Sequence, residues 1–234
     1  MSQKPDPHIS AEVKINLTIL VLGAMVMILN ETALSVALPT IMADFGIPAT
    51  SAQWLLTGFL LTMGVVIPTT GFLMDKFTTR QIFLASSGMF LAGTVLAALA
   101  PAFGVLLVGR VFQAAGTALM IPTLMMVAMT LVPPQRRGSV MGIISVVISV
   151  APALGPTVGG FVLSMSSWHV IFWTMVPLLG LICAAGYFRL VNVGDKRDTP
   201  LDFPSVVLSV IAFGGLVYAV SSLENMLEGD GLVD

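Results

Sequence analysis

Two charged residues, Glu31 and Arg110, lie inside long apolar runs of this 234-residue chain. A charged side chain at the centre of a membrane helix costs about 2.5–3.5 kcal/mol on insertion scales, so such residues usually face a protein interior, where they pair or act. A carboxyl group whose protonation responds to burial and to a nearby cation can take up and release a proton. The pair therefore predicts a proton-binding site. The alternative is a static polar pair that only fixes helix packing.

Two uncharged polar residues accompany these charges. Asn30 precedes Glu31, and Gln113 lies one turn inward of Arg110, so we expect both to face a common cavity. On straight helices Glu31 and Arg110 differ in depth by about 7 Å, which a long side chain and a modest tilt can cover. Residues 30–32 also match the glycosylation pattern N-x-[ST], but a position inside the membrane argues against an attached glycan.

The composition indicates that membrane helices position these residues. The chain is 56% hydrophobic and 9% charged, whereas a soluble domain carries about 25% charged residues. Runs of about 20 apolar residues can cross a bilayer, and the sequence contains seven. They are Ile15–Leu38, Trp54–Met74, Ile82–Ala100, Phe103–Leu131, Val140–Leu163, Val170–Leu190 and Val206–Leu223. The predicted fold class is an all-α integral membrane protein, and membrane lipid is an expected partner.

Basic residues predict the orientation of the chain. Nine of the ten Lys and Arg residues fall on alternate loops, which the positive-inside rule assigns to the cytoplasm. The N-terminus, which lacks the features of a cleaved signal peptide, is then cytoplasmic, and the expected location is the cell membrane. The predicted organisation is a cytoplasmic tail (1–14), a six-helix bundle (15–190), a cytoplasmic connector (191–202), a seventh transmembrane helix (203–223) and an outer-side tail (224–234).

A weak internal echo points to a repeat within the bundle. LPTIM ends the first span on the outer side, and IPTLM lies in the inner half of the fourth. Matching pieces at opposite depths are expected of an inverted repeat of three plus three helices.

Four segments carry a family resemblance. LNETALSVALP lies in the first span, GFLMDKFTTR follows the second, LLVGRVFQAAGTA lies in the fourth and APALGPTVGG in the fifth. Together they resemble motifs of the major facilitator superfamily. The match is to its fourteen-span drug:proton antiporters of the EmrB/QacA type, and more narrowly to lincomycin-resistance-like efflux proteins. The resemblance implies that the bundle is the first of two six-helix bundles.

The resemblance also implies roles for the membrane charges. Asn30 stands at the position of the family's aspartate and cannot titrate, so Glu31, one residue on, is the carboxyl group that remains. Arg110 matches the family arginine that takes part in proton coupling. The implied proton-coupling residues are Glu31, Arg110 and Asn30, and the implied substrate cavity includes Asn30, Glu31 and Gln113.

Two further motifs imply moving parts. GFLMDKFTTR is similar to G-x-L-A-D-R-x-G-R-K, with Thr78 and Thr79 in place of a glycine and an arginine. It implies a gating turn, with the matching residues Gly71, Asp75, Lys76 and Arg80. APALGPTVGG is similar to the antiporter motif G-x-x-x-G-P-x-x-G-G, with the matching residues Gly155, Pro156, Gly159 and Gly160. The glycines and the proline of this motif predict a kinked helix with small residues on one face, against which a neighbouring helix can pack closely and rock.

The expected function is therefore proton-coupled efflux of amphipathic small-molecule drugs by alternating access. Because the chain holds seven spans, it is expected to be a truncated N-terminal half that needs a C-terminal half or a partner subunit. Two alternatives remain: a non-transporting membrane fragment that binds a full-length transporter, and a metabolite facilitator or symporter. No enzyme motif, cofactor motif, metal-ligand spacing or basic patch for nucleic acid occurs in the sequence.

Overall fold

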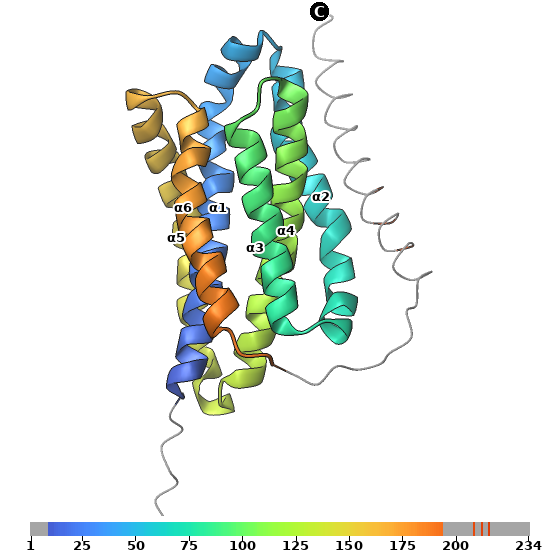
Figure 1. The fold of residues 1–234 in the computed structure, drawn as a ribbon, viewed down its shortest axis with the longest axis vertical. Helices are drawn as coiled ribbons and strands as arrows, with labels where there is room; N and C mark the ends of the chain where they lie inside the picture. Colours follow the sequence, from blue (N-terminus) through green and yellow to red (C-terminus); the bar gives the residue numbers. More distant parts are fainter. Residues whose placement is uncertain (1–8, 194–207, 209–211, 213–214, 216–234) are drawn as a thin grey trace, which may run out of the picture.

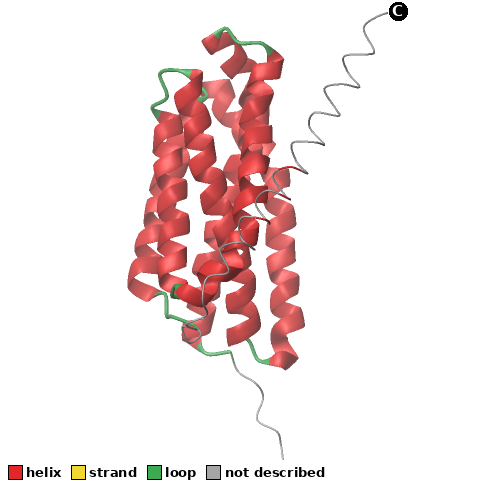
Figure 2. Ribbon diagram, turned by 90° about the vertical axis from the view of Figure 1, so that its right-hand side faces the viewer, coloured by secondary structure: helices red, strands yellow, loops and turns green. Residues whose placement is uncertain are grey.

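The computed structural model describes residues 9–193 together with Leu208, Ala212 and Gly215. Residues 9–193 form six helices long and apolar enough to cross a membrane, packed as one bundle with short connections (Figure 2). They are α1 (Ala11–Phe45), α2 (Ala49–Lys76), α3 (Thr79–Ala98), α4 (Phe103–Leu131), α5 (Pro134–Met165) and α6 (His169–Arg189). The prediction of an all-α membrane bundle is confirmed. The predicted seventh span lies outside the continuous described stretch.

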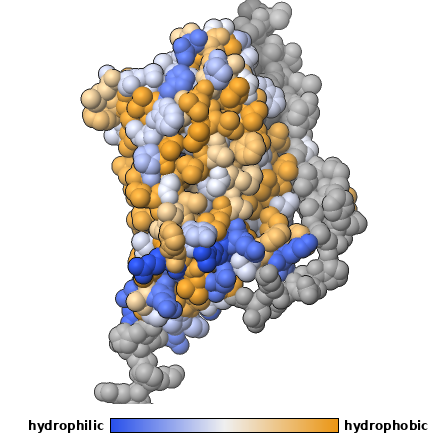
Figure 3. Space-filling model, viewed as in Figure 1, coloured by the Kyte–Doolittle hydropathy of each residue, from blue (hydrophilic) through white to orange (hydrophobic). Residues whose placement is uncertain are grey.

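Consecutive helices run in opposite directions, so that alternate connections lie at the same end (Figure 1). The start of α1, the α2–α3 and α4–α5 turns and the end of α6 share one end, which we call the basic end. The described basic residues other than Arg110 all lie there: Lys14, Lys76, Arg80, Arg136, Arg137 and Arg189. Figure 3 shows hydrophilic side chains gathered at this end beside a largely apolar surface. The predicted alternation of basic loops therefore corresponds to the folded topology.

The packing pattern has the symmetry of a three-plus-three repeat. The main neighbours are α1 with α5, α2 with α4, α3 with α4, and α1 with α6, while α3 also packs on α6 and α1 on α4. Exchanging α1, α2 and α3 with α4, α5 and α6 converts α1–α5 into α2–α4 and α3–α4 into α1–α6, and leaves α1–α4 and α3–α6 unchanged. Because consecutive helices alternate in direction, the two triplets are inverted, as an inverted repeat requires.

Several helices extend beyond the predicted spans because the caps, and not the ends of the apolar runs, fix their length. The Ser10 side chain accepts a hydrogen bond from the Val13 backbone nitrogen at 3.3 Å and starts α1. Gly46 ends α1 in the left-handed conformation, with φ 61°, and its N–H bonds to the Met42 carbonyl. The resulting 35-residue helix is about 52 Å long, so it projects beyond a hydrocarbon core of about 30 Å.

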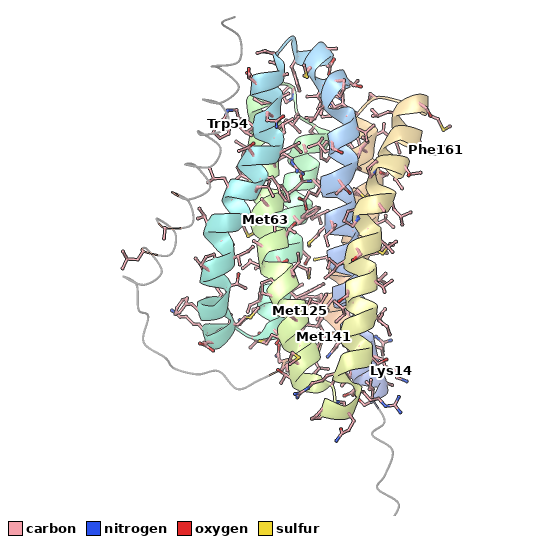
Figure 4. The ribbon with its side chains drawn as sticks, turned by 180° about the vertical axis from the view of Figure 1, so that it is seen from behind. Lys14, Trp54, Met63, Met125, Met141 and Phe161 are labelled. Carbon is pink, nitrogen blue, oxygen red and sulfur yellow. The ribbon has the colours of Figure 1, made fainter. Side chains whose placement is uncertain are left out.

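Two helices leave much of their surface uncovered. Only 17% of the most apolar stretch of α2 and 22% of that of α5 are buried, against 61% in α4. Side chains on α2 and α5, including Trp54, Met63, Met141 and Phe161, are visible on the face shown in Figure 4. Helix α4 is therefore the most enclosed of the six described helices, whereas α2 packs mainly on α4 and α5 mainly on α1.

Candidate functional site

The candidate site lies where α4 is enclosed by α1, α2 and α3. Arg110, Gln113 and Thr117 are spaced along one face of α4, and all three are buried. The spacing of three and four residues places them on successive turns of that face. The polar groups that the sequence placed in the membrane are therefore inside the protein, away from lipid.

Glycines allow α3 to approach α4 closely enough to join this site. A methyl group on Gly93 would lie 2.5 Å from the Gly109 carbonyl oxygen and 2.8 Å from the Gln113 backbone nitrogen. Further along, a methyl group on Gly116 would lie 2.6 Å from the Ser86 carbonyl oxygen. These positions require glycine, because any side chain would push the two helix backbones apart.

Arg110 is held from two sides. Its Nε donates to the Leu55 carbonyl oxygen of α2 at 3.2 Å, and its Nη1 donates to Gln113 Oε1 at 3.0 Å. The guanidinium carbon lies 4.1 Å from the centre of the Phe59 ring, a favourable cation–π geometry. A buried positive charge is thus stabilised by a carbonyl, an amide and an aromatic face.

Gln113 extends this network to α1 and α3. Its Nε2 donates to Asn30 Oδ1 at 3.0 Å and to Thr94 Oγ1 at 2.9 Å. Arg110 can only donate, so Gln113 must turn its oxygen to Arg110 and its nitrogen to Asn30. Asn30 must then present its own oxygen to Gln113, which fixes the direction of every hydrogen bond from Arg110 to Asn30.

Two buried donors at this site are unused. Asn30 Nδ2 and Arg110 Nη2 are buried, and neither has a hydrogen-bond partner within the part of the chain that the structure describes. A carboxylate at position 30, the residue type that the family resemblance implies, would accept from Gln113 without presenting an unused donor. The asparagine therefore preserves the bond to Gln113 but adds one unused buried donor, its own Nδ2, which costs free energy.

Glu31 lies beside this network without a hydrogen bond to it. It follows Asn30 on α1, so its side chain is turned by about 100° around the helix axis, and it is only partly buried. Glu31 and Arg110 interact electrostatically, but within residues 9–193 no hydrogen bond joins them. The two membrane charges are therefore neighbours at longer range, and Gln113 is the direct partner of Arg110.

The structure adds three groups that the sequence reasoning missed: the Leu55 carbonyl, the Phe59 ring and the Thr94 hydroxyl. A backbone carbonyl leaves no trace in sequence, and a phenylalanine in an apolar run is unremarkable. Thr94 gave a usable signal, because it is a polar residue directly after Gly93, where α3 meets α4.

The remaining predicted residues lie in two places away from this network. Gly71, Asp75 and Lys76 are exposed near the basic end of α2, whereas Arg80, in the first turn of α3, is partly buried. In α5, a methyl group on Gly159 would lie 2.7 Å from the Ala33 carbonyl oxygen of α1. Gly155 likewise abuts Thr32 and Ala33, while Gly160, the neighbour of Gly159, has open space.

Pro156 lies between these glycines, inside α5. It follows Gly155 and comes four residues after Pro152, so two backbone N–H donors are missing from one part of this helix. The glycines and prolines together make the part of α5 that touches α1 small and weakly hydrogen-bonded.

The fold and the buried polar network together define a polytopic helical membrane protein. The sequence profile of the Major Facilitator Superfamily matches residues 20–224, and the chain belongs to this family. The family predicted from the four motifs is confirmed.

Relatives with resistance-related names cover most of the chain. It is 42% identical to the lincomycin resistance protein LmrB of Bacillus subtilis over 212 residues, which cover 91% of this chain and 44% of the relative. It is 45% identical to the MFS-type transporter YcnB of the same organism over 88% of this chain and 43% of that one. The putative multidrug resistance protein MdtD of Salmonella heidelberg is 29% identical over 90% of this chain. The chain spans less than half the length of these relatives.

Solved structures show the same fold. The human organic anion transporter MFSD10 matches with a TM-score of 0.69 at 17% identity, over 86% of this chain and 53% of that one. A peptide transporter, POT, in complex with sulfate matches with a TM-score of 0.70 at 16% identity, over all of this chain and 49% of that one. At such identities the likeness concerns the fold alone.

Proposed function

We propose that this chain forms the N-terminal half of a proton-coupled exporter of amphipathic drugs that works by alternating access. The observation that carries the proposal is the buried Arg110 with its unused Nη2 donor, in electrostatic range of the partly exposed Glu31. A buried charge near a titratable carboxyl group is the arrangement expected where proton binding is coupled to a change of state.

In the proposed cycle Glu31 carries the proton. The ionised carboxylate is attracted to Arg110 and supplies an acceptor for Nη2, whereas the protonated form has no charge to hold it there. Asn30 cannot titrate, so it acts as a fixed link between α1 and Gln113. A proton on Glu31 thus changes how strongly α1 is held against α4. In the proposed cycle this change favours one of the two positions that the bundle takes against the second half.

The proposed substrate surface lies on the face of α2, α4 and α5 shown in Figure 4. Met63, Met125 and Met141 come from α2, α4 and α5, are partly exposed, and are seen together on the face shown in Figure 4. Methionine side chains are flexible and polarisable and adapt to ligands of different shape. This surface suits amphipathic drugs, and the names of LmrB and MdtD, which refer to lincomycin and multidrug resistance, support this substrate class.

The proposal also includes an orientation and a partner. Gathering of the basic residues at one end supports a cytoplasmic N-terminus in the cell membrane. The uncovered faces of α2 and α5 and the relatives' greater length support a second half that completes the cavity. The same two observations favour the main alternative, a non-transporting fragment that associates with a longer transporter.

Drug accumulation in a sensitive host tests the proposal. The chain alone and the chain extended by its natural downstream sequence are expressed separately, with and without a protonophore. We expect the extended form to lower drug accumulation several-fold and the protonophore to abolish this effect, because the proton gradient drives export. The proposal is wrong if the extended form exports nothing, or exports equally well without a gradient. Full export by the short chain would instead show that no second half is needed.

A further inference from the structure

The four residues that follow α6, Leu190–Val193, lie across the basic ends of α1 and α3. We call them the exit segment, because they follow the last helix of the bundle. The Val191 backbone nitrogen donates to Asn16 Oδ1 of α1 at 3.2 Å. Leu190 and Val193 are buried and belong to the main core cluster. The exit segment is therefore packed onto the bundle as well as hydrogen-bonded to it.

Thr79 forms the centre of this attachment. Its hydroxyl donates to the Val193 carbonyl oxygen at 3.1 Å and accepts from the Val193 backbone nitrogen at 3.3 Å. Thr79 itself is buried and follows Thr78, whose side chain caps α3 in a capping box with Gln81. A hydroxyl that both donates and accepts can satisfy the two backbone groups of Val193, which an arginine at this position could not do.

Arg80 binds the same part of the chain. Its backbone nitrogen donates to Asn192 Oδ1 at 3.2 Å, and its guanidinium donates to the Tyr187 carbonyl oxygen at the end of α6. The guanidinium carbon also lies 4.7 Å from the centre of the Tyr187 ring. The side chain of Arg80 is thus engaged within this half of the protein.

The other charged residues of the same motif are placed differently. Asp75 and Lys76 are exposed at the end of α2, and the ring contact of Lys76 with Phe72 is long, at 6.0 Å. We propose that Thr79 and Arg80, with Asn16, are positioning residues that anchor the exit segment to α3 and α1. This task is separate from the gating role that the family resemblance implies for the exposed Asp75 and Lys76. Only the gating role of Asp75 and Lys76 rests on the proposed function.

Amide hydrogen exchange of the full chain in lipid nanodiscs tests the anchoring without any transport assay. Thr79→Val removes the hydroxyl but keeps the shape of the side chain. We expect exchange at the Val193 amide to rise roughly 2- to 10-fold, the range given by one ordinary hydrogen bond, while Thr79→Ser keeps the wild-type rate. Asn16→Leu is expected to raise exchange at Val191 by a similar factor.

Two references separate anchoring from general loosening of the fold. Thr123→Val removes a buried hydroxyl that bonds only within α4, to the Leu119 carbonyl, and should leave Val191 and Val193 unchanged. Amides in the middle of α4 should exchange equally in every variant. Unchanged Val193 exchange in Thr79→Val, or an equal rise in Thr79→Ser, would overturn the proposal. Uniformly faster exchange that includes α4 would also overturn it, because the effect would then not be local.

Discussion

Replacing Arg110 with lysine is expected to reduce drug export to the background level, although the positive charge is kept. Arg110 bonds to Leu55 and Gln113 and stacks on Phe59 at the same time, and a lysine ammonium lacks the planar fork that reaches all three. Losing one hydrogen bond from a buried charged group costs about 1.5–3 kcal/mol. Gln113 Oε1 would lose its donor, and the link to Asn30 would loosen.

The variants are made in the extended protein. The measurement is the initial rate of proton-driven drug uptake into inverted membrane vesicles, normalised to the amount of the extended protein in the membrane. Arg189→Lys is the matched control, because Arg189 is exposed in the last turn of α6 and has no expected part in the network. Wild-type transport by Arg110→Lys would show that charge alone matters at this position, and that the geometry described above is not required.

Gly155→Ala is expected to disrupt the contact between α1 and α5. The added methyl group would overlap the Thr32 side chain and lie 3.0 Å from the Ala33 backbone nitrogen, and Thr32 is already fixed by hydrogen bonds to the Ile28 and Leu29 carbonyls. Overpacking of this kind costs about 1–3 kcal/mol. We expect a lower midpoint of thermal unfolding and the loss of most export activity.

Gly160→Ala provides the control within the same motif, since a methyl group there meets no atom within 4 Å. It should unfold at the wild-type temperature or slightly above, because alanine favours a helix more than glycine does. Thermal unfolding in detergent and export rates are compared for both variants. Equal behaviour of the two would mean that close packing of α5 on α1 is not what the motif provides.

Much of the fold follows from the sequence because membrane helices are governed by two simple signals. Apolar length predicted the six described helices, and the alternation of basic loops predicted which of their ends lie together at the basic end. The helix limits were less accurate: α1 was expected over Ile15–Leu38 but extends over Ala11–Phe45, because Ser10 and Gly46 act locally and carry no hydropathy signal.

The candidate site was only partly predictable. Arg110, Gln113 and Asn30 were identified by type and spacing, and the structure joins them in one network. The sequence drew attention to Glu31 as the neighbour of Arg110. In the structure Arg110 donates its hydrogen bonds to Gln113 and to the Leu55 backbone carbonyl. Those contacts depend on how closely α2 and α3 approach α4, a distance set by residues such as Gly93 that hydropathy does not weigh.

The structure also explains why this chain departs from the gating motif at two positions. Thr78 and Thr79 replace residues of the family pattern, and by sequence alone they only weaken the match. In the structure Thr78 caps α3 through Gln81, three residues on, and Thr79 bonds to Val193, 114 residues away in the chain. The pairing of Thr79 with Val193 depends on the tertiary fold, so neither composition nor spacing could have indicated it.

The central claim is that Glu31 carries the coupled proton, and drug-induced proton release tests it most directly. The purified, extended protein in weakly buffered detergent solution is mixed with drug, and the proton release is followed with a pH indicator. We predict release from the wild-type protein and from Glu31→Asp, which keeps a carboxyl group, but none from Glu31→Gln, which still binds the drug. Full proton release from Glu31→Gln would contradict the account, because the proton would then come from another group.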